Sequence, residues 1–342
     1  MNPHTNTSGN PGAANGSLSR NILKRRETTL LLLVLVLTAG VALRAPGFVA
    51  PNSLLNVVTD SCILFIVSIG QFLVILIGGI DLSIGSTMAL VGMGTAMLNQ
   101  ANPAIPAWVF IPMSLIFGAV LGLINGGLVG YGKLPPIIAT LGTQSAYRGI
   151  VFLLSKGQWV TANEMTEGFR KIPEGRFIGM PYMFWAAFVV GIVALVFMRY
   201  TRSGRDIYAI GGNKTAALFA GVSERKVDLV AFTVSAALAG LAGLLYVSRY
   251  GIAQNETASG FELQAVATNV LGGVNIAGGA GTVLGVLLGT LFLGVVNNAL
   301  PVLRMSPFLQ MVIQGFIILA AIVANRLMDK RRQRRAEGRG RP

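Results

Sequence analysis

Residues 54–77 read LLNVVTDSCILFIVSIGQFLVILI, an apolar run that stops at the turn-like Gly78-Gly79-Ile80-Asp81. A second apolar run follows at once, from Leu82 to Leu98. Because a helix of about 20 mostly apolar residues can cross a bilayer, this stretch predicts two membrane spans joined by a glycine turn. The turn sets one carboxylate, Asp81, deep between the two spans.

The same length criterion, applied outward along the chain, finds ten candidate spans. In chain order they are Thr28–Leu43, Leu54–Ile77, Leu82–Leu98, Ala107–Tyr131, Pro135–Leu154, Pro181–Met198, Val227–Val247, Ala265–Ile276, Gly281–Leu300 and Phe308–Ala324. The first run also fits a cleaved signal peptide, with Ala42 as a weak cleavage cue, but nine further spans favour a retained anchor. The eighth is short enough to be re-entrant. We therefore expect an all-α, polytopic integral membrane protein with about ten transmembrane helices.

The composition excludes most catalytic chemistry. Of 342 residues, 53% are hydrophobic and 12% charged, whereas a soluble domain carries about 25% charged residues. The only histidine is His4 and the only cysteine is Cys62, so we expect no catalytic triad, metal site, haem or iron-sulfur cluster. Glycine is in excess, with 43 residues against a usual share of about 7%, and small residues let transmembrane helices approach closely.

The net charge of +14 is explained by where the basic residues lie. With the N-terminus inside and sides alternating at each span, 19 basic residues fall inside and 7 outside, which predicts cytoplasmic termini. We expect a disordered cytoplasmic tail over residues 1–27, a transmembrane domain over 28–326 and a basic cytoplasmic tail over 327–342. Such clusters fit anionic membrane lipid, and nucleic acid is not an expected partner because no aromatic-basic platform accompanies them.

Three charged residues near or within the predicted spans need an explanation. Asp81 would cost about 3 kcal/mol or more at the bilayer centre unless it is paired, hydrated or at a helix end. Two interpretations stay open: it caps the amides of the third helix, or it binds a coupling ion or polar substrate. Asp60 is expected to be solvated or interfacial, and Arg148 to snorkel or pair.

The longest basic connection, residues 199–226, carries helical signals. Asn213 can cap a short helix that holds Ala216, Ala217 and Ala220 and ends at Gly221. An apolar-faced helix between basic flanks predicts docking on another protein, although a plain connecting loop is the alternative. The segment is not a phosphate loop, because Tyr208 and Asn213 occupy the two positions where that motif needs glycine.

Neutral polar side chains within the spans are candidate substrate contacts, because amides and hydroxyls suit an uncharged polyol or sugar. They are Gln71, Asn125, Thr140, Thr143, Gln144, Asn269, Asn275, Asn297, Asn298, Gln310 and Gln314. Interhelical hydrogen bonding explains any one of them equally well. A weak repeat accompanies them, since Gly78-Gly79-Ile80-Asp81 is similar to Gly272-Gly273-Val274-Asn275. Matching interrupted helices are typical of membrane carriers, and coincidence among glycine-rich helices is the alternative.

Three motifs resemble the permeases of ABC-type monosaccharide importers, the bacterial inner-membrane subunits of the ribose, rhamnose, xylose and autoinducer-2 type. They are the run from Ile77 to Ser86, the segment from Gly204 to Gly221, and Val270 to Val274 with Gly278-Gly279. The resemblance covers about residues 28–324, in the same order and spacing. It implies alternating-access transport of a monosaccharide or related small polyol, with no catalysis by this chain.

The resemblance also implies partners and site residues. The partners are a second permease subunit, identical or different, a periplasmic sugar-binding protein, and a cytoplasmic ABC ATPase that binds the ATP and Mg, so that no cofactor is expected on this chain. The ATPase-coupling helix, cytoplasmic and formed by Asn213 to Gly221, would involve Gly204, Gly212, Asn213, Ala216, Ala217 and Gly221. The translocation path would involve Gln71, Gly78, Gly79, Asp81, Ser83, Asn125, Asn269, Asn275, Asn297 and Asn298. Residues 158–161 and 254–261 would face the binding protein.

The substrate and the class of transporter each keep an alternative. Residues 134–143 with 147–149 resemble the autoinducer-2 and rhamnose branches, whereas Asn297-Asn298 and residues 308–311 resemble the ribose branch. An ion-coupled secondary sugar transporter is the other class. It would need a membrane-embedded network of ionisable groups, and Asp81 alone gives thin support.

Overall fold

The fold was determined as a computed structural model that describes residues 12–306, 308–317, 319–320 and 323. The predicted basic tail, 327–342, lies outside the described residues, as do residues 1–11 of the predicted N-terminal tail. α1 (Gly12–Arg44) begins within that predicted tail.

The described chain is almost entirely helical. After α1 come α2 (Pro51–Leu76), α3 (Ile84–Ala101), α4 (Phe110–Gly130), α5 (Pro136–Ser155), α6 (Glu167–Glu174), α7 (Tyr182–Tyr200), α8 (Arg202–Gly212), α9 (Lys214–Phe219), α10 (Glu224–Tyr250), α11 (Phe261–Leu271) and α12 (Val283–Val302). Short 3-10 turns, η1 (Pro46–Val49) and η2 (Ala107–Val109), precede α2 and α4. Two antiparallel pairs of two-residue strands complete the list: β1 (Val160–Thr161) with β4 (Ile252–Ala253), and β2 (Arg176–Phe177) with β3 (Met180–Pro181).

Seven helices of the described chain are long and apolar enough to cross a membrane: α1 from Glu27, α2, α4 with η2, α5, α7, α10 and α12. Three predicted spans are not among them. The third is α3, a continuous 18-residue helix that begins two residues later than predicted and is less apolar, and the eighth is the 11-residue α11 followed by a loop. The tenth lies only partly within the described residues, where Phe308–Ile317 is helical. The all-α polytopic fold is confirmed; the turn at Gly78 separates α2 from α3 as predicted, and a loop interrupts the eighth predicted span.

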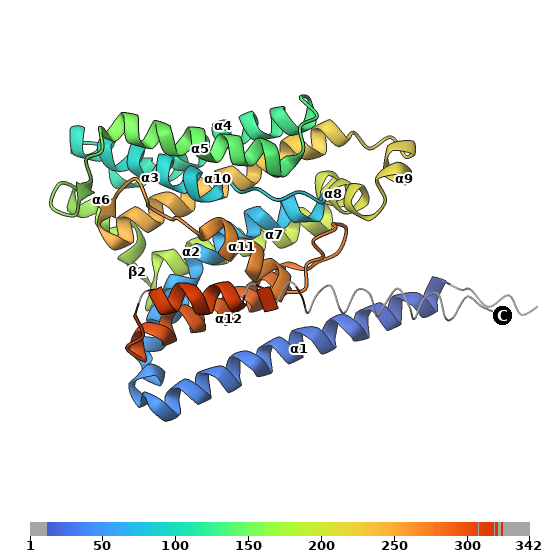
Figure 1. Cartoon of the computed structure of the whole chain (residues 1–342), viewed down its shortest axis with the longest axis horizontal. Helices are drawn as coiled ribbons and strands as arrows, with labels where there is room; N and C mark the ends of the chain where they lie inside the picture. Colours follow the sequence, from blue (N-terminus) through green and yellow to red (C-terminus); the bar gives the residue numbers. More distant parts are fainter. Residues whose placement is uncertain (1–11, 307, 318, 321–322, 324–342) are drawn as a thin grey trace, which may run out of the picture.

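α2 and α10 form the centre of the bundle. Every residue of α2 from Ser61 to Leu76 is buried, and α10 lies against α2, α3 and α4. α1 lies at the edge of the bundle beside α12, with leucine side chains exposed as a lipid-facing helix requires (Figure 1).

Glycine brings α4 and α10 into backbone contact. A Cβ added at Gly118 would lie 2.2 Å from the carbonyl oxygen of Ala236, and one at Gly122 would lie 2.5 Å from that of Phe232. On α10, a Cβ at Gly240 would lie 2.3 Å from the carbonyl oxygen of Ser114. This contact accounts for part of the glycine excess, as the packing of small residues in membranes predicts.

The two ends of the bundle differ. α8 and α9 lie at one end, and α6 with β2 lies at the opposite end (Figure 1). The long apolar helices run between them, so the two ends correspond to the two membrane surfaces.

Candidate functional site

The loop that follows α11 contacts the glycine turn that follows α2. The amide of Gly279 donates to the carbonyl oxygen of Leu76 at 2.9 Å, which joins this loop to the end of α2. Gly278 has a φ of +94°, and a Cβ there would lie 3.0 Å from the amide nitrogen of Gly78. Only glycine suits this combination of left-handed backbone and close approach. The breaks after α2 and after α11 therefore lie against each other.

α8 closes over the same junction. A Cβ at Gly211 would lie 1.7 Å from the carbonyl oxygen of Leu76, so the backbone of α8 touches the end of α2. The Tyr208 hydroxyl donates to the carbonyl oxygen of Gly281 at 2.8 Å, just before α12. Burial raises the pKa of Tyr208 to about 12, so the phenol keeps its proton near neutral pH. α8 is thus in contact with the end of α2 and with the residues just before α12.

The helix after α8 has the predicted cap and end. The Asn213 side chain accepts a hydrogen bond from the Ala216 amide at 3.0 Å, and Gly221 follows α9 with a φ of +81°. Ala217 is the buried residue of α9, while Phe219 is 90% exposed at its end. α9 therefore presents an exposed aromatic ring at that end of the bundle.

Two glycines of the predicted coupling set differ in their surroundings. A Cβ at Gly204 would lie 2.3 Å from the carbonyl oxygen of Phe197, so Gly204 closes the corner between α7 and α8. No neighbouring atom lies within 4 Å of a Cβ at Gly212, so packing does not require glycine there. Lys214 forms an ion pair of 2.5 Å with Glu224, which ties the start of α9 to the start of α10.

Asp81 belongs to a wholly buried polar cluster. Its Oδ1 accepts from the Ser83 amide at 2.9 Å and from the Ser83 hydroxyl at 2.6 Å. Asn125 of α4 donates to the same hydroxyl at 2.8 Å. The Gln71 amide of α2 lies 3.2 Å from both the backbone nitrogen and oxygen of Asp81, within reach of a two-point hydrogen bond. Four predicted path residues, Gln71, Asp81, Ser83 and Asn125, are therefore in one place.

The capping prediction for Asp81 needs correction in detail. The N-cap of α3 is Ser83, and its side chain makes no capping hydrogen bond. Asp81 instead binds the amide of the N-cap residue itself, because the chain stays extended until Ser83. Among the described residues, Asp81 Oδ2 and Asn125 Oδ1 have no hydrogen-bond partner.

Asn269 lies in a second cluster that fixes α11 to α2. It donates to the carbonyl oxygen of Ser68 at 2.9 Å, and the hydroxyls of Ser68 and Thr268 lie 2.6 Å apart. Sequence reasoning missed Ser68 and Thr268. The signal available was small, because Thr268 merely precedes the predicted Asn269 and serine is common in membrane helices.

The other predicted path residues are separate. Gly79 packs near Val74 and Pro136, and Asn275 bonds within its own loop, to Gly278 and Ala277. Asn298 donates to Gly294 one turn back on α12.

Asn297 joins three elements. It donates to Gln264 of α11 at 3.2 Å and accepts from Gln314 at 3.1 Å. Asn297 and Asn298 therefore do not share a site with Asp81.

The predicted outer segments are brought together at the end opposite α9. β1 pairs with β4, with Val160 opposite Ala253, so residues 158–161 lie beside the segment that starts at Gln254. Arg148 of α5 donates to the carbonyl oxygens of Asn255 at 2.6 Å and Thr257 at 2.8 Å, which ties α5 to that loop.

Charged residues near this end have partners that the sequence did not reveal. Asp60 was expected to be solvated or interfacial; it is partly exposed and pairs with Arg249 at 3.1 Å, a partner that the sequence did not indicate. Glu262 was also missed. It is buried in the first turn of α11, where its Oε1 accepts from the Gly260 amide at 3.3 Å. An acid at the start of an apolar helix was the available signal.

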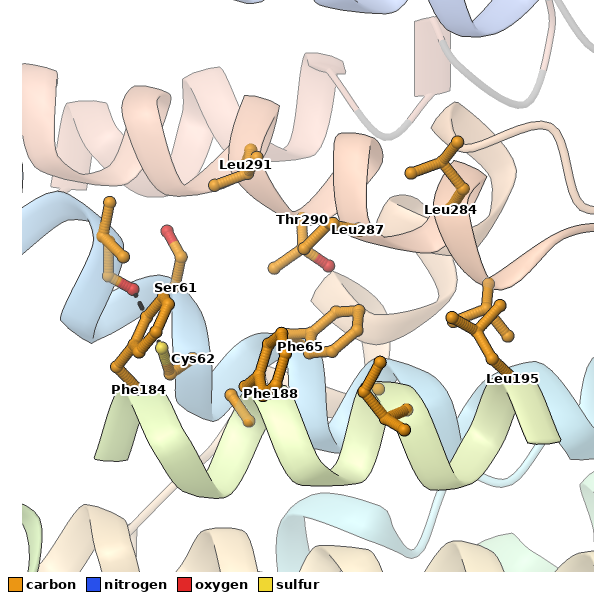
Figure 2. Close-up of a pocket in the computed structure, with 15 residues that line it drawn as sticks. Ser61, Cys62, Phe65, Phe184, Phe188, Leu195, Leu284, Leu287, Thr290 and Leu291 are labelled. Atoms are coloured by element: carbon orange, nitrogen blue, oxygen red, sulfur yellow. Dashed lines mark hydrogen bonds between the residues drawn. The ribbon is translucent and has the colours of Figure 1, made fainter. Parts of the chain in front are cut away.

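An apolar groove between α2, α7 and α12 offers no polar path. Figure 2 shows Phe65, Phe188, Leu195 and Leu287 converging on a space of about 480 Å³ between α2, α7 and α12. Ser61 and Thr290 are near it, but both hydroxyls bond to their own helices. A sugar would find few partners there. Among the described residues, no group of three His, Cys, Asp or Glu side chains is placed to hold a metal ion.

Comparisons with known proteins agree with this architecture. The family described as "Branched-chain amino acid transport system / permease component" matches residues 53–322. The ribose import permease protein RbsC of Haemophilus influenzae is 35% identical over 321 residues, which is 93% of this chain and 98% of the relative. The D-allose transport system permease protein AlsC of Escherichia coli K12 is 34% identical over 304 residues, covering 88% and 92%.

A third relative is named for a different substrate. The autoinducer 2 import system permease protein LsrC of Salmonella typhi is 33% identical over 302 residues, covering 88% of this chain and 86% of the relative. No solved structure matches the chain. The comparisons do not support an ion-coupled carrier. With its long apolar helices, the chain is a multi-pass protein of the inner membrane. It belongs to the branched-chain amino acid transport system permease family and is a permease component of an ABC importer.

Proposed function

We propose that this chain imports a monosaccharide or a related small polyol by alternating access, powered by a separate ATPase. Relatives named for ribose, D-allose and autoinducer 2 support the substrate class. The polar clusters around Asp81 and Asn269 support it as well, because apart from the Asp81 carboxylate they consist of neutral amides and hydroxyls. No covalent chemistry is required of the chain.

We place α9 in a cleft of the ATPase, as the coupling helix. The observation that carries this assignment is the capped α9 with Phe219 exposed, joined through α8 to the end of α2 and the start of α12. ATP and Mg would be held by the ATPase. When its subunits close, α9 would move, and α8 would transmit the displacement through Gly211 to α2 and through Tyr208 to the start of α12. These contacts lie where the path must open and close.

We place both termini and α9 in the cytoplasm, and β1 and β4 on the periplasmic side. The basic bias of 19 inside against 7 outside supports this orientation. The paired strands would then meet the sugar-binding protein. The domain bounds remain those proposed from the sequence, with a transmembrane domain over 28–326 between cytoplasmic tails.

We further propose that two permease subunits, identical or different, enclose the path between them. The exposed apolar residues of α5, including Ile137, Ile138 and Leu141, leave a face that a second subunit can cover. Within one chain the polar clusters are packed shut, so a path at a subunit interface fits this arrangement.

Replacing Ala216 with glutamate tests the coupling assignment. Ala216 is exposed on α9, so the variant should fold and reach the membrane. We expect it to lose most of its ATPase on co-purification and to lose sugar uptake. Ala104→Glu is the control, since Ala104 is an exposed alanine in the turn between α3 and η2, outside the membrane spans and away from α9; it should retain the ATPase. Normal co-purification and uptake by Ala216→Glu would refute the assignment.

A further inference from the structure

A second groove in the membrane-facing surface differs from the one in Figure 2, because charged and aromatic side chains line one end of it. It lies between α4 and α7, with α10 behind it and α6 at its rim, and encloses about 710 Å³. We call it the α4–α7 groove. Small-molecule sites commonly measure about 300–1,000 Å³, so the space is large enough for a ligand.

The lining changes character along the groove. At the rim are Trp108, Lys171, Tyr182 and Trp185, all at the α6 end of the bundle (Figure 1). Towards the middle of the bundle the lining is aliphatic, with Leu115, Val190 and Leu238. Trp108 and Leu115 are about two helical turns apart, or roughly 11 Å. Half of a bilayer's hydrocarbon core is about 15 Å. The groove therefore extends from a membrane surface into one leaflet.

One residue of the rim, Lys171, belongs to a pair of opposite charges. Lys171 forms an ion pair with Glu167 on the preceding turn of α6, just outside the lining, and both side chains are more than half exposed. The Lys171 ammonium lowers the pKa of the Glu167 carboxyl, so Glu167 stays a carboxylate at neutral pH. Tryptophan and tyrosine at this level are typical of the headgroup region of a membrane.

From this arrangement we propose that the α4–α7 groove binds one phospholipid with a primary-ammonium, zwitterionic headgroup, that is, phosphatidylethanolamine. An acyl chain fills the aliphatic part. Lys171 meets the phosphate and Glu167 accepts from the ammonium, so the two charges of this pair match the two charges of the headgroup. A quaternary ammonium cannot donate such a hydrogen bond. In the orientation proposed above this lipid belongs to the outer leaflet.

Native mass spectrometry of the purified full-length chain tests the proposal. The delipidated chain is titrated with phosphatidylethanolamine, phosphatidylcholine and phosphatidylglycerol of matched acyl chains. We expect one phosphatidylethanolamine to be retained per chain, with the other two bound roughly tenfold more weakly, a difference of about 1.4 kcal/mol. Equal retention of all three lipids would overturn the headgroup assignment.

Two pairs of variants test the groove and the charge near its rim separately. Ala186→Phe fills the groove and should abolish retention, whereas Val193→Phe, on the exposed face of the same helix, should not. Glu167→Gln should remove the preference for ethanolamine over choline, whereas Glu174→Gln, exposed at the end of α6, should keep it. Wild-type retention by Ala186→Phe, or equal loss in both phenylalanine variants, would overturn the site.

A second copy of the chain is the competing occupant. Crosslinking between copies through cysteines placed at Val189 would show it and would overturn the lipid proposal. Because every readout is lipid retention or crosslinking, the result is independent of whether the chain transports a sugar.

Discussion

Asp81 is a buried carboxylate that the described ion pairs do not include. The hydroxyl and amide of Ser83 both donate to its Oδ1, and hydrogen bonds to a carboxylate offset part of the cost of burying it. The contacts therefore favour a role in shaping the turn before α3. The partnerless Oδ2 is the feature that an ion or substrate role would use.

Substitution of Asp81 distinguishes these two roles. Asparagine keeps an acceptor at Oδ1, so Asp81→Asn should unfold at nearly the wild-type temperature and retain uptake. Alanine leaves the Ser83 donors unsatisfied, at a cost of about 1–3 kcal/mol, so Asp81→Ala should unfold at a lower temperature in detergent. A stable Asp81→Asn variant without uptake would instead assign Asp81 to an ion or to the substrate.

At the residue scale, the features that could be predicted from the sequence were those that depend on neighbouring residues. The Asn213 cap and the Gly221 end depend on a few neighbouring residues and were readable from the sequence. The pairing of Asp60 with Arg249 joins residues 189 positions apart, and Ser68 meets Thr268 across 200 positions. Such partners depend on how the helices pack, and this packing cannot be read from a single sequence.

At the element scale, the glycine contact between α4 and α10 should determine stability. Gly118→Ala would force a Cβ to 2.2 Å from the Ala236 carbonyl oxygen, and overpacking of this kind costs about 1–3 kcal/mol. We expect a lower unfolding temperature by a thermal-shift assay in detergent. Gly127→Ala on the same helix meets no atom within 4 Å. It should be neutral or stabilising by up to about 1 kcal/mol, because alanine favours a helix. Equal destabilisation by both changes would contradict the contact.

Hydropathy predicted where the membrane helices lie better than it predicted where a loop interrupts them. The long apolar runs of α2, α10 and α12 are continuous helices, as expected. The turn at Gly78 was predicted between the second and third spans, whereas the loop at Gly273 interrupts the eighth predicted span; each glycine has a positive φ that ends a helix. The length of an apolar run does not distinguish such a loop from helix, whereas the repeated glycine pairs are present at both places.

At the scale of the whole molecule, the basic bias, the glycine turns and α9 are arranged as the proposed importer requires. α9 lies at one end, the paired strands lie at the other, and the two glycine turns join the spans between them. A carrier driven by an ion gradient would need ionisable groups along its path. The clusters found here are chiefly amides and hydroxyls, which agrees with the proposal that a separate ATPase supplies the energy through α9.

Sugar uptake into proteoliposomes tests this account most directly. The chain is reconstituted alone, and with its ATPase and binding protein, and accumulation of labelled ribose, rhamnose, allose or autoinducer 2 is measured with and without ATP. We predict uptake of one of these sugars only when all the components and ATP are present. Uptake by this chain alone, driven by a proton or sodium gradient, would contradict the account.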